Sequence, residues 1–431
     1  MTVAIAGAAS ASSTDNPSRL DAYLAAHDFD RPTLVIDVDR VETQYRALKA
    51  GLGSADIHYA VKANPAREVI ARLVKLGSHF DAASRGEIET CLGEGATPDQ
   101  ISFGNTIKRR QDIEWARDNG ITLFAADAEE ELEKIAEIAP GSDVYIRLIV
   151  EASEADWPLT RKFGCDGDTA IRLMGYAKSL GLSPVGMSFH VGSQTRRAEM
   201  WAPALDALAK VWHGAKAAGH DLTLLNIGGG FPIKHNLGFE YDYQFMINEI
   251  VGNIKVACKK AKVPMPNIYT EFGSFTVGES MAHIYSVIAE KVQNDRETWY
   301  MIDSSFITTL PDTWGIGEKF LMLPVNKWNS EYQRVVLGGI TCDSHDYYDS
   351  EEHINEVFLP KTNDGGEPLY VGFFHTGAYQ DQISGYGGIK HCLIPSPKHV
   401  IVGYDRNGKL HDWVYAKQQT AQSMLKILGY K

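Results

Sequence analysis

The chain has 431 residues, of which 44% are hydrophobic, so it can bury more than one core and we expect a large domain with a smaller one. The formal net charge of −13 argues against a nucleic-acid partner, and no run approaches the roughly 18 apolar residues of a membrane span. The five cysteines are scattered without a C-x-x-C pair, which indicates neither a disulfide framework nor a zinc knuckle and makes the cytoplasm the expected location.

The N-terminal segment is rich in small residues, and we interpret 1–20 as a flexible arm. It lacks the basic region and the long apolar run of a secretory signal. The first β-rich run follows at 33–39 and precedes the main repeating pattern. Pairing of this run with strands near the C-terminus would give a discontinuous domain, which we predict to comprise 21–37 together with 276–431.

Between about residue 55 and residue 275, short β-rich runs alternate with amphipathic stretches such as 129–137 and 200–218. This alternation is typical of parallel strands joined by helical crossovers. The candidate strands lie at 58–62, 79–83, 101–105, 122–126, 144–148, 186–191, 223–228 and 268–272. Eight such units in about 220 residues predict an α/β domain, a (β/α)8 TIM barrel over 38–275.

After residue 275 the pattern changes to β-branched and aromatic runs separated by turn residues. These runs lie at 298–306, 334–342, 369–379, 398–405 and 411–416. They predict a second, mostly β domain that resembles a sandwich or a barrel.

The ends of the predicted barrel strands carry polar residues, and the active sites of TIM barrels gather at such ends. Lys62 ends the first strand among apolar neighbours. Partial desolvation and nearby cations would lower the pKa of this lysine and leave its amine able to form a Schiff base. A strand-end lysine by itself is more often a surface residue or an ion-pair partner.

Other strand ends supply the groups that an aromatic phosphate cofactor needs. His190 offers a flat ring, and the glycines 228–230 can turn backbone N–H groups toward a phosphate, although tight turns use glycine equally often for steric reasons. Glu271 offers a carboxylate that would keep a pyridine nitrogen protonated, so that the ring accepts electrons. Together with Lys62, this set predicts pyridoxal 5′-phosphate as the cofactor.

Seven segments carry a resemblance to a known family. They are YAVKAN at 59–64, FDAASRGEIE at 80–89, ISFGNTIK at 101–108, SFHVGSQ at 188–194, GGGFP at 228–232, TCDS at 341–344 and GAY at 377–379. The chain resembles the alanine racemase-fold (fold type III) pyridoxal-phosphate decarboxylases, closest to the ornithine decarboxylase family, over nearly its whole length after residue 30.

The resemblance implies a role for each matching residue. Lys62 would carry the cofactor as a Schiff base, His190 would stack on its ring and Glu271 would hold its ring nitrogen. Further cofactor contacts would come from Ser193, Gly229, Gly230, Gly273, Ser274 and Tyr379, and supporting contacts from Asp81, Glu87 and Arg147.

The resemblance also implies a shared site in a homodimer. Cys342 would return a proton to the substrate α-carbon after carbon dioxide leaves, and Asp343 would bind the distal cation of the substrate. Both residues would reach the active site from the partner subunit.

Two departures from the family pattern bear on the cofactor and the substrate. Ser274 stands where the family usually has an arginine, and a serine cannot give the charged, bidentate clamp of a guanidinium on a phosphate. The segments 302–316, 340–346 and 369–380 look more like biosynthetic arginine decarboxylases, whereas 156–164 looks like bacterial ornithine decarboxylases.

We therefore predict a carboxy-lyase acting on a basic L-amino acid, with L-ornithine or L-lysine favoured and a diamine such as putrescine as product, in polyamine biosynthesis. Arginine decarboxylation to agmatine is the alternative. Asp303 and Asp312 are further candidates for binding the substrate cation, and either could equally be a solvated turn carboxylate.

Two other classes were weighed. A racemase of the same fold needs a base on each face of the α-carbon, whereas TCDS offers a cysteine and a carboxylate. A non-catalytic homologue would fit the missing arginine, but Lys62, His190, Glu271 and Cys342 are all present. Asp343 would repel the distal carboxylate of meso-diaminopimelate, and the acidic segment 343–353 lacks a recognised ligand spacing, so we predict no metal site.

Overall fold

The computed structural model describes residues 19–150, 162–234, 241–294, 296–348, 357–362, 366–404 and 407–430. The predicted arm at 1–20 lies almost wholly outside these residues; Arg19 and Leu20 are described and begin helix α1 (Arg19–Ala26). None of the described helices is long and apolar enough to cross a membrane.

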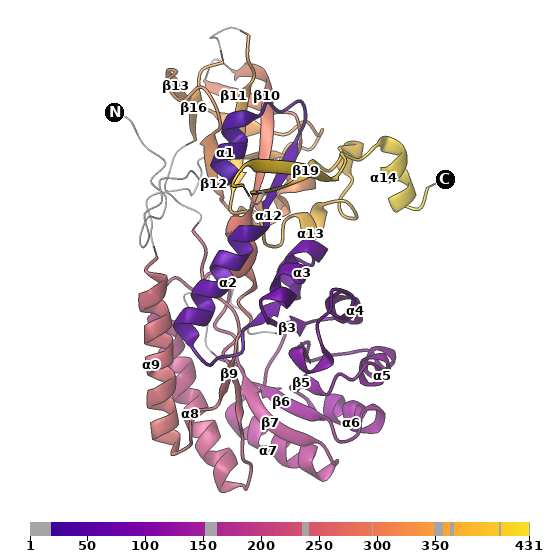
Figure 1. The fold of residues 1–431 in the computed structure, drawn as a ribbon, viewed down its shortest axis with the longest axis vertical. Helices are drawn as coiled ribbons and strands as arrows, with labels where there is room; N and C mark the ends of the chain where they lie inside the picture. Colours follow the sequence, from indigo (N-terminus) through magenta and orange to yellow (C-terminus); the bar gives the residue numbers. More distant parts are fainter. Residues whose placement is uncertain are drawn as a thin grey trace.

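Eight parallel strands follow one another in chain order and form the first sheet (Figure 1). They are β2 (His58–Ala60), β3 (His79–Ala82), β4 (Ile101–Phe103), β5 (Leu123–Ala126), β6 (Asp143–Arg147), β7 (Ser183–Ser188), β8 (Leu224–Asn226) and β9 (Asn267–Tyr269). A parallel bridge from Asp56 to Tyr269 brings the start of this sheet next to its end. Each strand overlaps one predicted segment, so the predicted TIM barrel is confirmed.

Helix α2, which precedes the first of these strands, and the seven described helices between the strands form the outer ring of the barrel (Figure 1). They are α2 (Val38–Leu52), α3 (Arg67–Lys75), α4 (Arg85–Gly93), α5 (Arg110–Asp118), α6 (Glu129–Ile138), α7 (Gly167–Ser179), α8 (Trp201–Ala217) and α9 (Tyr243–Ala261). In α3, Val69, Ile70 and Leu73 are fully buried at helical spacing, and each such side chain stabilises the fold by roughly 1.5–3 kcal/mol. Short 3₁₀ turns lie at η1 (Val61–Ala63), η2 (Pro98–Gln100), η3 (Ala198–Met200) and η4 (Gly278–Ser280).

The second sheet has the order β15-β14-β11-β10-β1-β18-β19, and β17 joins it by pairing with β10 and β12. Its strands are β1 (Thr33–Asp37), β10 (Met281–Gln293), β11 (Glu297–Ile302), β12 (Leu321–Pro324), β14 (Val336–Gly338), β15 (Tyr347–Tyr348), β17 (Leu369–Phe374), β18 (Lys398–Tyr404) and β19 (Leu410–Ala416). A separate pair joins β13 (Tyr332–Arg334) and β16 (Phe358–Pro360). The remaining elements are α10 (Gly273–Val277), α11 (Phe306–Thr309), α12 (Pro311–Ile316), α13 (Asp381–Ser384), η5 (His391–Leu393) and α14 (Ala421–Ile427).

Strand β1 lies inside this second sheet, antiparallel to β10 and parallel to β18. Its last residue, Asp37, accepts hydrogen bonds from the backbone N–H groups of Asp39 and Arg40 and so caps α2. The chain therefore passes from the second sheet into the barrel within one residue.

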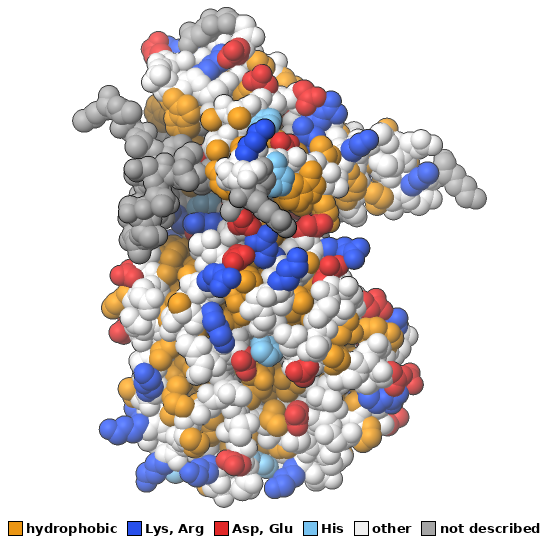
Figure 2. Space-filling model, viewed as in Figure 1, with side chains coloured by type: hydrophobic (Ala, Val, Ile, Leu, Met, Phe, Trp, Pro, Cys, Tyr) orange, Lys and Arg blue, Asp and Glu red, His pale blue; other side chains and the backbone are white. Residues whose placement is uncertain are grey.

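Strand β10 was not among the predicted runs, and its burial explains why. The first seven residues of the strand are buried on both faces and the next five are exposed on both, so no alternation of period two is present. Around β10, the second domain has its own aromatic core, in which Phe373 packs edge-to-face against Tyr348 and Phe306 at centroid distances of 5.0 and 5.5 Å. On the face shown in Figure 2, acidic and basic side chains are interspersed over the barrel rather than gathered by sign.

Candidate active site

Lys62 lies on the turn η1 directly after strand β2. The hydroxyl of Tyr59 donates to the carbonyl oxygen of Asn64 over 2.9 Å, and the Asn64 side-chain amide donates to the carbonyl oxygen of Gly377 over 2.8 Å. The backbone N–H of Tyr379 donates to the carbonyl oxygen of Ala63. The second domain thus fixes the turn that carries the lysine, whose side chain remains 40% exposed toward a cavity.

Two carboxylates flank the Lys62 amine. Its Nζ lies 3.6 Å from Oε2 of Glu271 and 3.8 Å from Oδ2 of Asp81. Burial alone would lower the lysine pKa, but the charges of Glu271 and Asp81 outweigh it, and the pKa is raised. The predicted lowering of the Lys62 pKa is therefore wrong for the chain without a bound cofactor, because the charged neighbours of the amine are mainly carboxylates.

The two carboxylates have different surroundings. Glu271 accepts a hydrogen bond from the Asn226 side-chain amide over 2.9 Å; burial opposes its ionisation, yet the charge of Lys62 and this hydrogen bond keep its pKa lowered. Asp81 is 3% exposed, and its Oδ1 has no hydrogen-bond partner among the described residues. Burial, followed by the charge of Glu271, raises the pKa of Asp81 to about 8. Near neutral pH the site therefore pairs an ionised carboxylate with one that keeps its proton.

Sequence reasoning missed Asn226 and Gly104, which position these carboxylates. Asn226 ends β8, and its polar side chain at a strand end was an available signal. At Gly104 an added Cβ would lie 1.7 Å from Oδ1 of Asp81, so any larger residue would displace the carboxylate. A glycine after a strand carries no such signal in the sequence.

His190 presents a neutral ring. The backbone N–H of Gly192 donates to its Nδ1 over 3.0 Å, and burial lowers its pKa to about 3. An added Cβ on Gly229 would lie 2.8 Å from its Nε2. The ring and the glycine loop after β8 are therefore packed as one unit.

The glycine loop and three hydroxyl groups line a small hollow next to Lys62. Gly230 has φ +93°, and an added Cβ there would lie 2.2 Å from the carbonyl oxygen of Gly192. The hydroxyl-bearing side chains of Tyr379, Ser274 and Ser193 line the same hollow. The hollow is lined by Lys62, His190, Ser193, Gln194, Gly229, Gly230, Phe231, Glu271, Phe272, Gly273, Ser274 and Tyr379. Among these described residues Lys62 is the single Lys or Arg.

A larger cavity of ≈ 440 Å³ opens from the same lysine toward the second domain. Arg147 lines it with its guanidinium carbon 5.0 Å from the centre of the Phe163 ring. Asp312 on α12 also lines it; its Oδ2 accepts a hydrogen bond from the Gln380 side-chain amide over 2.7 Å, and burial raises its pKa. Sequence reasoning missed Gln380, which follows the GAY segment.

Other predicted residues lie outside this cavity. Asp303 accepts from the backbone N–H of Ser286 over 2.9 Å and does not line it, so its position does not support contact with the substrate. Glu87 accepts from the backbone N–H of Ala83 over 2.6 Å and so supports the turn after β3. Cys342 and Asp343 lie on a loop after β14, away from the cavity of their own chain.

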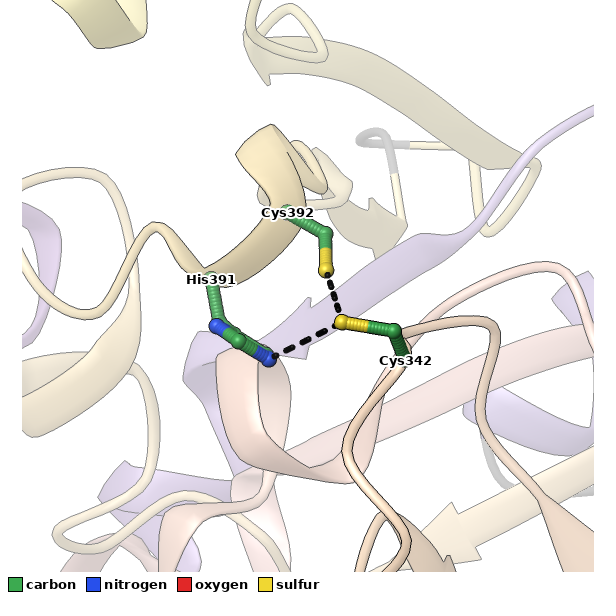
Figure 3. A group of neighbouring side chains, drawn as sticks. All are labelled: Cys342, His391 and Cys392. Carbon is green, nitrogen blue, oxygen red and sulfur yellow. Dashed lines mark hydrogen bonds between the residues drawn. The ribbon is translucent and has the colours of Figure 1, made fainter.

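Cys342 has neighbours that the sequence did not suggest. Its Sγ lies 3.4 Å from Sγ of Cys392 and 3.9 Å from Nε2 of His391 (Figure 3). In the acidic segment 343–353, Asp346 is buried and accepts from the Phe306 backbone and the Thr341 hydroxyl, whereas 349–353 lies outside the described residues.

Comparisons with known proteins agree with this geometry. A family model described as pyridoxal-dependent decarboxylase, pyridoxal binding domain, matches residues 38–278. A lysine/ornithine decarboxylase of Selenomonas ruminantium is 32% identical over 316 residues, which cover 73% of this chain and 78% of that one.

Solved structures give the same picture. A lysine/ornithine decarboxylase of Vibrio vulnificus complexed with cadaverine has a TM-score of 0.75 and 26% identity, covering 89% of this chain and 97% of that one. The arginine decarboxylase of Paramecium bursaria Chlorella virus, bound to agmatine, has a TM-score of 0.73 and 26% identity, covering 84% and 95%.

Proposed function

The chain belongs to the pyridoxal-dependent decarboxylases, and from this premise we propose that it removes the α-carboxyl group of L-ornithine or L-lysine and releases the corresponding diamine. The observation that carries the proposal is the cavity of ≈ 440 Å³ that Lys62 shares with Asp312. In this cavity the amine of Lys62 would bind the cofactor, and the carboxylate of Asp312 would bind the distal cation of the substrate.

The residues around Lys62 fit pyridoxal phosphate. When bound, this cofactor supplies an aldehyde that condenses with amines and a ring that takes up the electron pair released with carbon dioxide. Lys62 would hold the aldehyde end, Glu271 the ring nitrogen, and the neutral ring of His190 would lie against the cofactor ring. The hollow beside Gly229 and Gly230 would take the phosphate, and both positions require glycine, because an added Cβ would lie 2.8 Å from Nε2 of His190 or 2.2 Å from the Gly192 carbonyl oxygen.

Two residues manage protons in this arrangement. The Lys62 ammonium must lose a proton before its amine can act as a nucleophile, and Asp81, with a pKa of about 8, can bind or release one near neutral pH. Glu271 stays ionised because Lys62 and the Asn226 amide stabilise its charge, so it can keep a bound pyridine nitrogen protonated.

Asp312 would bind the distal ammonium of the substrate. Gln380 fixes the carboxylate by its 2.7 Å hydrogen bond, which reduces the side-chain entropy lost on binding. Ornithine and lysine each end in an ammonium that a single carboxylate oxygen can accept, whereas a guanidinium is best bound by both oxygens. One Asp312 oxygen is already engaged with Gln380, which favours the ammonium substrates.

Cys342 and Asp343 would serve the active site of a partner subunit. Cys342 is exposed and lies outside the cavity of its own chain, which supports a homodimer with two shared sites. In such a dimer Cys342 would return a proton to the α-carbon. We further propose a cytoplasmic enzyme of polyamine biosynthesis.

Release of labelled carbon dioxide tests the reaction. The purified chain with pyridoxal phosphate would be given carboxyl-labelled ornithine, lysine or arginine in separate incubations, with Lys62→Ala as the blank. We expect release from ornithine or lysine well above arginine. A preference for arginine would identify an agmatine-forming enzyme, and a change of substrate chirality without carbon dioxide would identify a racemase.

Mixing two inactive variants tests the shared site. A dimer of one Lys62→Ala chain and one Cys342→Ala chain contains one site with both residues intact, so mixing should restore part of the activity that each variant lacks. Mixtures no more active than their components would contradict the contribution of Cys342 from the partner.

A further inference from the structure

Two segments of the second domain meet at a group of three metal-binding side chains, Cys342, His391 and Cys392. Cys342 comes from the loop after β14, and the other two come from the turn η5, as Figure 3 shows. One ligand atom of each residue lies within 4.8 Å of the others. In the single chain all three side chains are exposed or half-exposed.

The spacing of the three ligand atoms fits a tetrahedral ion. Zinc binds thiolate sulfur at about 2.3 Å and imidazole nitrogen at about 2.0 Å, which at the tetrahedral angle places two sulfurs about 3.8 Å apart and sulfur and nitrogen about 3.5 Å apart. The observed values are 3.4 Å between the sulfurs and 3.9 Å between Cys342 Sγ and His391 Nε2. Shifts of a few tenths of an ångström would bring these two pairs to the zinc geometry, and the third pair, Cys392 Sγ and a His391 ring nitrogen, lies within 4.8 Å.

The backbone of the turn is held in an uncommon conformation. Cys392 has φ +52° and Leu393 has φ +53°, which lie in the left-handed region that residues other than glycine rarely adopt. Two such residues follow one another in this turn, and such conformations concentrate at functional sites. In this turn the Cys392 thiol points toward Cys342 (Figure 3).

We propose that Cys342, His391 and Cys392 form a binding site for zinc or a divalent ion of similar preference, with water in the fourth position. On binding, each thiol releases its proton to solvent, two S–Zn bonds and one N–Zn bond form, and the hydrated ion loses the corresponding waters. Two thiolates and an imidazole are a ligand set that favours zinc over magnesium or calcium.

The site has a consequence that rests on the proposed function. A thiolate bound to zinc cannot donate a proton, so metal binding withdraws the proton donor Cys342 and should inhibit decarboxylation. The open fourth position and the exposure of the ligands make the ion exchangeable, so inhibition should be reversed by a chelator.

Cobalt substitution tests the site without reference to activity. Full-length protein, freed of metal and kept under a thiol-free reductant without oxygen, would be titrated with Co²⁺. We expect thiolate-to-cobalt charge-transfer absorption and the visible bands of tetrahedral cobalt, saturating at one ion per chain and lost when Zn²⁺ is added. Absence of these bands would overturn the proposal. It would also be overturned if glutathione disulfide linked Cys342 to Cys392 by a disulfide while the reduced protein bound no cobalt.

Ligand variants locate the site. Cys392→Ser and His391→Gln should each weaken zinc binding by at least about 100-fold, since loss of outer-shell partners alone costs about 10–100-fold. Cys258→Ala, a cysteine on helix α9 outside the group, is the matched control and should bind cobalt as the wild type does. Circular dichroism would verify the fold of each variant. Wild-type affinity in both ligand variants would contradict the assignment.

Activity separates this inference from the proposed function. Zinc should inhibit carbon dioxide release in the wild type and in Cys258→Ala, and to a much smaller extent in Cys392→Ser, which keeps Cys342. Cobalt and zinc binding with unchanged carbon dioxide release would leave the metal site supported and contradict the proton-donor role of Cys342.

Discussion

The barrel and the second domain deliver chemical groups to their surfaces in different ways. In the barrel, Lys62, Asp81, His190 and Glu271 each lie within two residues of a strand end, and a regular parallel sheet brings those ends together. In the second domain, Asp312 lies on a six-residue helix and Cys342 on a loop. Regular repetition makes the first set readable from the sequence, whereas the second depends on contacts between irregular segments.

The largest expected effect tests the barrel side of this comparison. Lys62→Ala should lower the rate of carbon dioxide release by about 10⁴-fold and abolish the absorption of bound pyridoxal phosphate, because no other described amine lines the hollow. Lys62→Arg is the matched control, since it keeps a cation between Asp81 and Glu271 without a nucleophilic amine. It should be equally inactive but more stable than Lys62→Ala, and activity in either variant would contradict the role of Lys62.

A smaller effect tests the contribution of the second domain. Asp312→Asn should raise KM for ornithine or lysine by about 10–100-fold with a lesser change in kcat, because a charge-assisted hydrogen bond contributes about 1.5–3 kcal/mol. Asp303→Asn, outside the cavity, should leave KM unchanged. An analogue of the substrate without the distal amine should bind to Asp312→Asn and to the wild type with the same affinity. If the variant bound this analogue tenfold more weakly as well, direct contact between Asp312 and the distal ammonium would be contradicted.

The pH dependence of stability tests the pair of carboxylates. Burial and Glu271 raise the pKa of Asp81 to about 8, so between pH 6.5 and 8 the folded state holds a proton that the unfolded state has released. The free energy of unfolding of the cofactor-free chain should therefore fall by roughly 1–2 kcal/mol as pH rises through this window. Burial lowers the pKa values of His190 and His283 to about 3, so these two side chains change the free energy of unfolding below this pH window, where they make it rise with pH.

Urea unfolding at several pH values would measure this slope. Asp81→Asn should flatten it, because the amide cannot titrate. The same slope in the variant and the wild type would assign the effect to another group.

The smallest effect compares two buried tyrosines. Tyr59 donates to the Asn64 carbonyl oxygen in the barrel, and Tyr285 shares a 2.6 Å hydrogen bond with Thr309 in the second domain. Tyr59→Phe and Tyr285→Phe should each lower the free energy of unfolding by about 1 kcal/mol. Because Tyr59 supports the Lys62 turn, its variant alone should also slow turnover; equal activity in both would mean that this hydrogen bond does not position the lysine.

Local sequence pattern predicted the eight barrel strands and the residues that end them, because side chains two or three positions apart decide which face is buried. It did not predict the raised pKa of Lys62, since the sign depends on how close Glu271 and Asp81 lie in space. Strand β10, the Gln380 hydrogen bond and the pairing of Cys342 with Cys392 were missed for a related reason. Each depends on contacts between segments far apart in the chain, and the sequence of one segment does not indicate which other segment it contacts.

The position of β1 has a consequence for how the molecule is made. Thr33 pairs with both Ile284 and Lys398, so one edge of this early strand finds its partner only after β10 is synthesised, and the other edge stays unpaired until β18 is made. The barrel can close once residue 269 is synthesised, whereas the second sheet must wait for its last strands. A nascent chain therefore holds a bare strand edge beside a finished barrel, and shortened products that end before β18 should be the most prone to aggregation.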